Sequence, residues 1–454
     1  MSEIRKAKQG RLVMSKIQVL LMSFCLFLVF GITNGASSAS AQSNPRFVPL
    51  GGAAKGALYV PDSGPPPHIA FLVTHRTSNY MTHASTAQLS GRGFMVLGMN
   101  SRFDNNDAIV NWEDIALDVR SGIRYLRSQP GITTVILIGP SAGAPVVSYY
   151  QAVAENGPAY CQGRNKLVEC SSQRLAGFVP TDRANGIVYL DPTLGSGSPL
   201  QSLNGSVQSE NNPANSINAS LDPFSVRNGF NPDGNSVYSK EFVKRYTDAQ
   251  SRRMNNLIDI AQTIKADIEA GKHFPTENDA FVIHRGSAEL ADLSTGVLCC
   301  TLNPAKLLKN NGTIENCCIV QTVRVPDPSG RESDASFEGT RFFTLTSFLS
   351  ANAIQSTNSL DGIDWCSSNA STICAVASIS VPTLVMSMQG HNLIRDGERT
   401  FESAGSADKD YIVIEGATHG GTGCTECTAV TGVNYSNARK NIFDYVAAWT
   451  KARF

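Results

Sequence analysis

The hydrophobic residues of this chain lie in short apolar runs that alternate with amphipathic stretches. Residues 69–74, 94–99 and 135–138 are three such runs, and each has the length of a buried strand rather than of a helix. Residues 112–128 carry apolar side chains at every third or fourth position, which predicts a helix with one buried face. Strands that alternate with helices indicate a parallel sheet covered by helices on both faces.

The same alternation continues beyond residue 140 and returns towards the end of the chain. Apolar runs at 186–190, 382–386 and 411–414 predict further strands. Helices are expected over residues 80–90, 144–154, 397–404 and 436–451. Together these elements predict an α/β fold built on one mostly parallel sheet.

The middle of the chain, residues 194–379, breaks this alternation. It begins with a stretch rich in Ser, Asn, Gly and Pro, continues with a long amphipathic helix expected over 240–270, and ends in a cysteine-rich stretch. The sheet needs the strands on both sides of this segment to be complete. We therefore predict a sheet domain in two parts, 42–193 and 380–454, with the middle segment inserted as a cap. A separate second domain is the alternative.

The first 41 residues carry the three parts of a secretory signal peptide. Basic residues come first, residues 19–32 form an apolar run, and Ala39-Ser40-Ala41 offers a small-residue cleavage site. The apolar run is shorter than the roughly 20 residues that cross a bilayer, so cleavage is favoured over a retained membrane anchor. We predict a secreted or periplasmic protein with no stable membrane insertion.

The cysteines agree with export. Of the 11 Cys, Cys25 lies in the signal segment, and the others fall into local groups at 161 and 170, at 299, 300, 317 and 318, at 366 and 374, and at 424 and 427. Clustered cysteines of even number in an exported protein predict disulfide bonds. The spacing of Cys424 and Cys427 also suits a metal, but no second pair with matching spacing follows, so no metal or organic cofactor is expected.

The overall charge excludes one class of function. Lys plus Arg and Asp plus Glu number 38 each, so the formal net charge is zero, and no Lys/Arg-rich run occurs beyond the signal segment. Nucleic-acid binding is therefore not expected. The hydrophobic fraction of 42% suits a globular protein with a substantial core.

The segment after the run at 135–138 carries the candidate nucleophile. Gly139-Pro140-Ser141-Ala142-Gly143 is a G-x-S-x-G pattern between a buried strand and a helix. On such a turn the serine hydroxyl is exposed at the carboxyl edge of the sheet, and small residues on either side avoid collisions. The following helix directs its N-terminal N–H groups at the same point, so the amide of Ala142 is a candidate oxyanion donor.

His419 is the candidate general base among the seven histidines. It lies in residues 416–421 (GATHGG), between the last predicted strand and the last helix, where a loop at the carboxyl edge can reach the turn at Ser141. It also follows Ser141 in the chain, as the order serine, acid, histidine requires. A serine hydroxyl needs such a base to act as a nucleophile.

On these motifs, residues 57–192 and 380–454 resemble the α/β-hydrolase family of serine esterases and lipases. The resemblance implies a second oxyanion donor in the loop after the first apolar run, where His75-Arg76 stands in place of the usual His-Gly. By position, that donor is the amide of Arg76 or of Thr77. His75 itself is expected to hold this loop rather than to take part in catalysis.

The acid of a catalytic triad has more than one candidate. In many members of the family it follows the next-to-last strand, but here that loop holds His391, either a polar contact to substrate or a structural residue. The other family position follows the strand before the cap and holds Asp191, whose carboxylate can accept the Nδ1–H of His419. Asp191 is the preferred acid, and Asp396 and Glu398 are the alternatives.

Two classes of function follow from these residues. The leading hypothesis is a carboxylic ester hydrolase in which Ser141 forms an acyl-enzyme, His419 transfers protons and Asp191 orients the histidine. Lactone, amide or C–C substrates would use the same groups. The alternative is a non-catalytic binding protein. This alternative predicts that the serine or the histidine is lost, and neither is lost. A third hypothesis, a membrane-tethered receptor, requires that the signal segment is retained. The expected partner is a small-molecule or polymeric ester, with the oligomeric state open.

Overall fold

The computed structural model describes residues 44–163, 165–213, 215–290, 300–325 and 330–454, and the expected signal peptide lies outside them. Within these residues ten strands form one sheet in the order β1-β2-β4-β3-β5-β6-β11-β12-β8-β9. The strands are β1 (Arg46–Pro49), β2 (Lys55–Tyr59), β3 (Ile69–Thr74), β4 (Met95–Asn100), β5 (Thr134–Pro140), β6 (Gly186–Leu190), β8 (Ala305–Leu308), β9 (Ile314–Cys318), β11 (Thr383–Met388) and β12 (Lys409–Ile414). Neighbours from β4 to β8 in this order run parallel, whereas β1, β2 and β9 pair antiparallel at the two edges. The predicted α/β fold with a mostly parallel sheet is confirmed.

Helices cover both faces of this sheet. They are α1 (Ala84–Ser90), α2 (Trp112–Arg127), α3 (Gly143–Asn156), α9 (Thr372–Ala377), α10 (Ile394–Ser403) and α12 (Ala438–Lys451). Successive side chains of a strand point to opposite faces, so Leu72 of β3 packs with α2 and α3, whereas its neighbour Phe71 packs with α1 and α12. Helix α1 begins at Ala84 rather than at residue 80, because the side chain of His83 accepts the N–H of Ser85 and caps the helix there.

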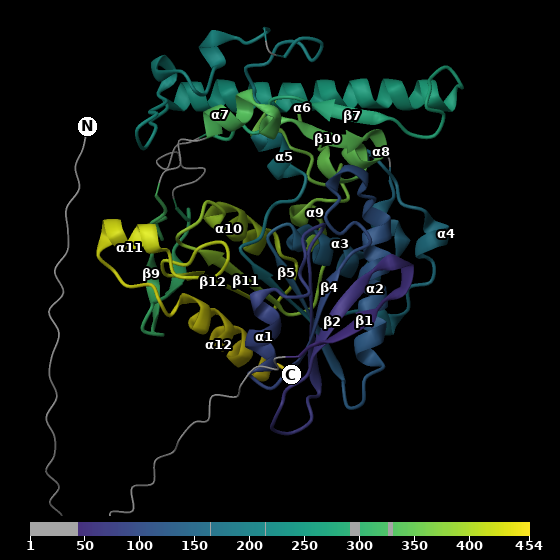
Figure 1. The fold of residues 1–454 in the computed structure, drawn as a ribbon, viewed down its shortest axis with the longest axis vertical. Helices are drawn as coiled ribbons and strands as arrows, with labels where there is room; N and C mark the ends of the chain where they lie inside the picture. Colours follow the sequence, from purple (N-terminus) through teal and green to yellow (C-terminus); the bar gives the residue numbers. More distant parts are fainter. Residues whose placement is uncertain (1–43, 164, 214, 291–299, 326–329) are drawn as a thin grey trace, which may run out of the picture. The chain divides into compact units, whose positions relative to one another are not determined.

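A second group of elements builds a separate apolar core on one side of the sheet (Figure 1). Its members are α5 (Gly197–Ser202), α6 (Lys240–Glu269), α8 (Leu345–Ser347), and the two-stranded sheet of β7 (Ala280–Ile283) and β10 (Arg341–Thr344). α7 (Gly330–Ala335) is tied to this group by polar contacts of Asp334 with Asn204 and Arg285. Met254 of α6 packs there with Phe281 and Phe343 of the small sheet and with Phe348. We call this group the cap.

The cap is smaller than the segment 194–379 predicted from the sequence. Residues 305–318 form β8 and β9, which extend the main sheet beyond β12, and α9 packs against α3. Leu307 and Leu308 are buried in the two core layers of the main sheet, so these short strands complete its edge. Strands of four and five residues within a cysteine-rich stretch carry too little periodicity to be recognised from sequence.

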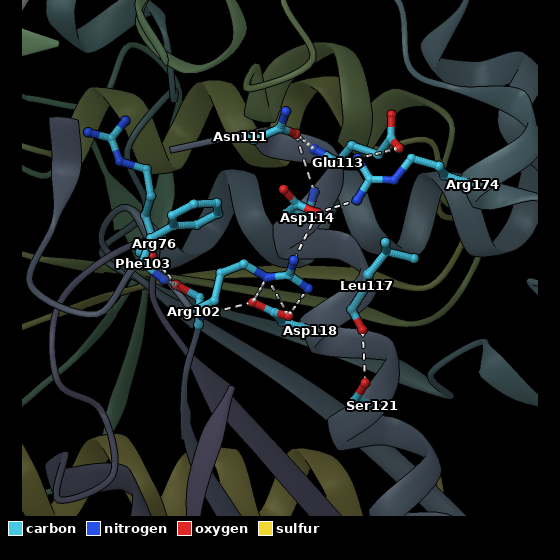
Figure 2. Close-up of polar contacts among 11 residues, drawn as sticks. Arg76, Arg102, Phe103, Asn111, Glu113, Asp114, Leu117, Asp118, Ser121 and Arg174 are labelled. Carbon is cyan, nitrogen blue, oxygen red and sulfur yellow. Dashed lines mark hydrogen bonds and ion pairs between the residues drawn. The ribbon is translucent and has the colours of Figure 1, made fainter. Parts of the chain in front are cut away.

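Ion pairs join α2 to the end of β4 (Figure 2). Arg102 donates to Asp118 from its backbone N–H at 2.8 Å and from Nη2 at 2.7 Å, and its Nη1 donates to Asp114 at 3.0 Å. Arg174 of α4 (Ser172–Leu175) pairs with Asp114 and, at 3.1 Å, with Glu113. We call these residues the α2 network.

Disulfides link neighbouring cysteines, as the local grouping suggested. Three of them join Cys161 to Cys170, Cys366 to Cys374, and Cys424 to Cys427 at the start of α11 (Thr425–Thr431). Cys300 and Cys318 are also disulfide-bonded. Among the described residues, no helix combines the length and the apolar character needed to cross a bilayer.

Candidate active site

Ser141 lies on the sharp turn that joins β5 to α3. Its φ angle is 53°, in the left-handed region that residues other than glycine rarely adopt. A Cβ on Gly143 would lie 2.3 Å from the carbonyl oxygen of Thr74, and a Cβ on Gly139 would lie 2.8 Å from that of Gly143. The close approach of α3 to the ends of β3 and β5 therefore requires both glycines of the motif.

The loop after β6 is tied to this turn through the backbone. β5 and β6 pair up to Pro140 and Leu190, so Ser141 and Asp191 each follow the last paired residue of their strand. The N–H of Ser141 donates to the carbonyl of Leu190 at 3.0 Å, and the N–H of Thr193 donates to the carbonyl of Ser141 at 3.2 Å. Two neighbouring parallel strands thus carry the hydroxyl and a carboxylate to the same edge of the sheet.

His419 contacts the carboxylate of Asp191. Its Nδ1 lies 2.6 Å from Asp191 Oδ2, and because an ionised carboxylate only accepts, Nδ1 carries the proton of this hydrogen bond. The N–H of Met388 donates to Asp191 Oδ1 at 3.1 Å. Burial raises the pKa of Asp191, but the interactions with the nearby rings of His391 and His419 outweigh it and hold that pKa below its usual value. The structure thus brings Asp191 and His419 together, which leaves Nε2 of His419 as an acceptor.

The two alternative acids have other partners. Glu398 accepts the N–H groups of Leu302 and Asn303 and contacts Arg395. Asp396 accepts the N–H of Leu194 and faces a cavity. Neither carboxylate contacts His419, so the structure favours Asp191 over both.

The loop that follows β3 presents the second candidate oxyanion donor. Nδ1 of His75 accepts the N–H groups of Thr77 at 3.3 Å and Ser78 at 3.1 Å, so the amide of Thr77 is already engaged. The amides of Arg76 and Ala142 donate to no acceptor among the described residues. Arg76 is therefore the better of the two candidates that the sequence left open.

Three side chains fix the position of Arg76, and sequence reasoning identified none of them. The hydroxyl of Ser101, directly after β4, donates to the Arg76 carbonyl at 2.7 Å, and the Ser101 hydroxyl oxygen accepts the N–H of Phe103. Figure 2 labels Arg76 and Phe103. The Arg76 guanidinium pairs with Asp107 at 2.5 Å and donates to Asn352 at 3.2 Å, which ties this loop to the base of the cap. No local sequence signal marks these contacts, because they join residues far apart in the chain.

His75 and His83 are neutral rings on either side of Tyr80. The ring centroids are 4.8 Å and 4.6 Å apart, and the planes are nearly parallel. Burial, with a smaller effect of Arg76, lowers the pKa of His75 to about 3, and burial lowers that of His83 to about 4. His75 therefore holds the loop as an acceptor and carries no charge next to the site.

Two cavities involve candidate residues of the site: Arg76 lines one and Asp396 the other, and α5 lines both through Ser198. The larger, of about 230 Å³, is lined by Arg76, Ser198, Met254, Ile283, Phe343 and Phe348, among others. The smaller, of about 70 Å³, lies against Asn392 and Asp396, directly after His391. Burial, together with the charges of Asp191 and Glu289, raises the pKa of Asp396 to about 7.

Comparison with known proteins gives likeness in fold at low sequence identity. No family model and no curated protein sequence matches this chain. A hypothetical protein from Pseudomonas aeruginosa is 11% identical, with 92% of this chain and 95% of that chain covered and a TM-score of 0.43. For a monoacylglycerol lipase from Paleococcus ferrophilus the identity is 11%, the coverage 87% and 98%, and the TM-score 0.37. For the α/β hydrolase GrgF from a Penicillium species these values are 9%, 88% and 94%, and 0.40.

These TM-scores are below 0.5, so any function has to be argued from the side chains of this chain itself. Its own architecture is distinctive enough to classify the fold. Its sheet is mostly parallel, and the strained Ser141 lies between β5 and α3. The loop that carries His419 follows β12, so the serine comes before the histidine along the chain, as predicted. The chain has an α/β-hydrolase fold.

Proposed function

We propose that this protein is a serine hydrolase that cleaves a carboxylic ester through an acyl-enzyme. The observation that carries this proposal is the contact of 2.6 Å between His419 Nδ1 and Asp191 Oδ2, beside the strained turn that holds Ser141. A buried carboxylate that accepts Nδ1–H fixes the tautomer in which Nε2 can take a proton. The His419 side chain is 39% exposed, so this contact does not serve to bury the ring in a core.

In the proposed reaction, His419 Nε2 takes the proton of the Ser141 hydroxyl as its oxygen attacks the ester carbonyl. The amides of Ala142 and Arg76, which have no other acceptor among the described residues, donate to the oxyanion that forms. His419 then passes its proton to the leaving alcohol, and a water molecule repeats the sequence to release the acid. Asp191 stabilises the charged imidazolium without taking the proton.

The cavity next to Arg76 gives the substrate a place beside the proposed oxyanion site. Its walls are mostly apolar, and they come from the cap as well as from the core. Pockets of this kind bind apolar groups and orient them by a few polar contacts. We therefore propose an ester with an apolar acyl group of short to medium length. A lactone, an amide or a C–C substrate would use the same groups and is the second candidate.

Export remains part of the proposal. The three local disulfides support it, because disulfides form and persist in oxidising compartments. Cleavage after Ala41 would leave Gln42 as the first residue of the mature chain, which N-terminal sequencing of protein recovered outside the cytoplasm would detect.

Labelling with a fluorophosphonate tests the proposal directly. The folded protein should form one covalent adduct, located at Ser141 by mass spectrometry, and should hydrolyse p-nitrophenyl butyrate faster than p-nitrophenyl palmitate. Ser141→Ala should abolish both, whereas Ser128→Ala, at an exposed position outside the site, should change neither. A folded protein without an adduct at Ser141 would instead support the binding protein.

A further inference from the structure

Asp191 faces two imidazole rings, although the proposed reaction uses only one. His391 Nδ1 lies 2.6 Å from Asp191 Oδ2, the same oxygen that accepts from His419. The two rings stack with centroids 4.3 Å apart and planes inclined by 28°. One oxygen and two nitrogens, which are all possible metal ligands, therefore lie within 4.8 Å of one another.

His391 Nδ1 lacks an adequate partner. The nitrogen is buried and makes no hydrogen bond of acceptable geometry, although it lies close to the carboxylate. Buried polar atoms are nearly always hydrogen-bonded, so such an atom calls for an explanation. Nothing in the proposed ester hydrolysis requires this ring.

We propose that Asp191, His391 and His419 form a binding site for a divalent transition-metal ion, represented by Zn²⁺, and that the bound ion inhibits the enzyme. Two imidazole nitrogens and one carboxylate oxygen are a common zinc ligand set, with metal–ligand distances of about 2.0–2.2 Å. Ligand atoms at those distances lie roughly 3.3 Å apart in a tetrahedron, so each short contact has to open by less than about 1 Å. Ca²⁺ and Mg²⁺ prefer oxygen ligands and should bind poorly.

The surroundings suit a cation. The Asp191 side chain is 1% exposed, and Met388 holds its other oxygen, so Oδ2 is fixed towards the two rings. The side chains of His391 and His419 are 29% and 39% exposed, which gives an ion access and leaves room for a water molecule as the fourth ligand.

The expected inhibition follows from which ring nitrogen of His419 carries the proton, and it rests on the proposed function. A neutral imidazole has one proton, so a metal ion on Nδ1 of His419 requires that proton to lie on Nε2. Nε2 then no longer accepts the proton of Ser141. The ion also separates Asp191 from His419, so both steps that activate the serine are lost.

Calorimetric titration of the untagged full-length protein with ZnCl₂ tests binding, and zinc titration of p-nitrophenyl butyrate hydrolysis tests inhibition. We expect one zinc ion per chain, inhibition that a chelator reverses, and no effect of Mg²⁺ at the same concentration. His391→Phe keeps an aromatic ring against His419 but removes a ligand. It should weaken zinc binding and zinc inhibition at least about tenfold, with the zinc-free rate of each variant taken as its own reference. His391→Gln provides a second variant in case the phenyl ring does not fit.

His284→Phe is the matched control. It removes an exposed histidine directly after β7 in the cap, and it should leave zinc sensitivity unchanged. Equal zinc sensitivity of the wild type and both His391 variants would overturn the inference, as would activation by zinc. Zinc binding to Ser141→Ala separates the two proposals. Binding that depends on His391 in a protein without esterase activity would refute the proposed function alone, whereas esterase activity without zinc binding would refute the metal site alone.

Discussion

Asp118 of the α2 network and Asp191 of the candidate active site are equally buried carboxylates, but their partners differ. Asp118 accepts several hydrogen bonds from the single residue Arg102, at distances from 2.7 to 3.2 Å (Figure 2). Asp191 has no arginine or lysine partner among the described residues; it accepts one backbone N–H and faces two histidine rings. One carboxylate is paired with a permanent charge, and the other with two imidazole rings, whose nitrogens can donate a hydrogen bond, accept one or bind a metal.

This difference distinguishes a buried carboxylate that stabilises the fold from a buried carboxylate that can take part in function. A buried carboxylate that a guanidinium satisfies on both oxygens stabilises the connection between two elements and cannot respond to a ligand. Asp191 is shared by two imidazole rings, and one ring nitrogen has no well-aligned hydrogen bond. Such a carboxylate can stabilise a positive charge that arises next to it. Substituting each carboxylate by its amide should therefore have opposite effects on catalysis and stability.

The largest effect is expected for Asp191→Asn. The amide keeps the shape and can still accept the N–H of Met388, but its NH₂ group would face His419 and favour the wrong tautomer. We expect kcat to fall by about 10⁴-fold, with little change in the unfolding midpoint. Steady-state kinetics with p-nitrophenyl butyrate, together with urea unfolding, would measure both. A loss below tenfold would assign the acid to another residue.

The matched substitution Asp118→Asn should show the reverse. Its NH₂ group would face the guanidinium of Arg102, so at least one hydrogen bond of the pair is lost and replaced by a repulsive contact. Because Arg102 is partly exposed, we expect a loss of about 2–3 kcal/mol in the free energy of unfolding and an unchanged kcat. Urea unfolding of both variants in parallel tests the comparison; a large fall in kcat here would show that the network belongs to the site.

The two regions also differ in what the sequence could reveal. Continuous apolar runs identified β3, β5, β6, β11 and β12, because strands buried on both faces need no polar positions. The edge strands β1 and β9 and their neighbours β2 and β8 were missed, since they are short and the pairing of β2 with β4 and of β8 with β12 joins segments far apart in the chain. For the same reason the predicted cap included two strands of the main sheet.

At the site, the motif around Ser141 and the order of the candidate residues carried the prediction. Those signals are local, because the turn demands small residues at fixed positions. The contact of His391 with Asp191 could not be predicted, since it depends on how far the loop after β11 leans towards the loop after β12. Ser101 was missed because a serine at a strand end has no distinguishing pattern.

Asp396 differs from both carboxylates, since it is partly buried and has no cation in hydrogen-bond contact among the described residues. Its folded pKa of about 7 is above its unfolded value, so the stability it contributes is present at low pH and is lost as pH rises through 7. The side chain of Asp396→Asn does not ionise, so the variant lacks this pH-dependent change in stability. Relative to the variant, the wild type should lose about 1–2 kcal/mol between pH 5 and pH 8, a figure discounted for partial exposure to the cavity.

Thermal unfolding of both proteins at the two pH values would measure this difference. A constant gap between their midpoints would show that Asp396 does not titrate in this range. Esterase activity should survive in Asp396→Asn, because the acid is expected to be Asp191. A loss comparable to that of Asp191→Asn would return Asp396 to the list of candidate acids.

The smallest effect is expected at the point where the α2 network meets the site. Ser101→Ala removes the hydroxyl that holds the Arg76 carbonyl at 2.7 Å, and the Arg76 amide is the proposed second oxyanion donor. The donor would remain but would be less well placed, so kcat should fall by roughly three- to tenfold, less than the loss of a donor, with KM nearly constant. Ser121→Ala removes a comparable bond from a serine hydroxyl to a backbone carbonyl, that of Leu117, on α2. If the two variants show the same kcat, the Arg76 amide does not contribute to the oxyanion site, because only Ser101 contacts its loop.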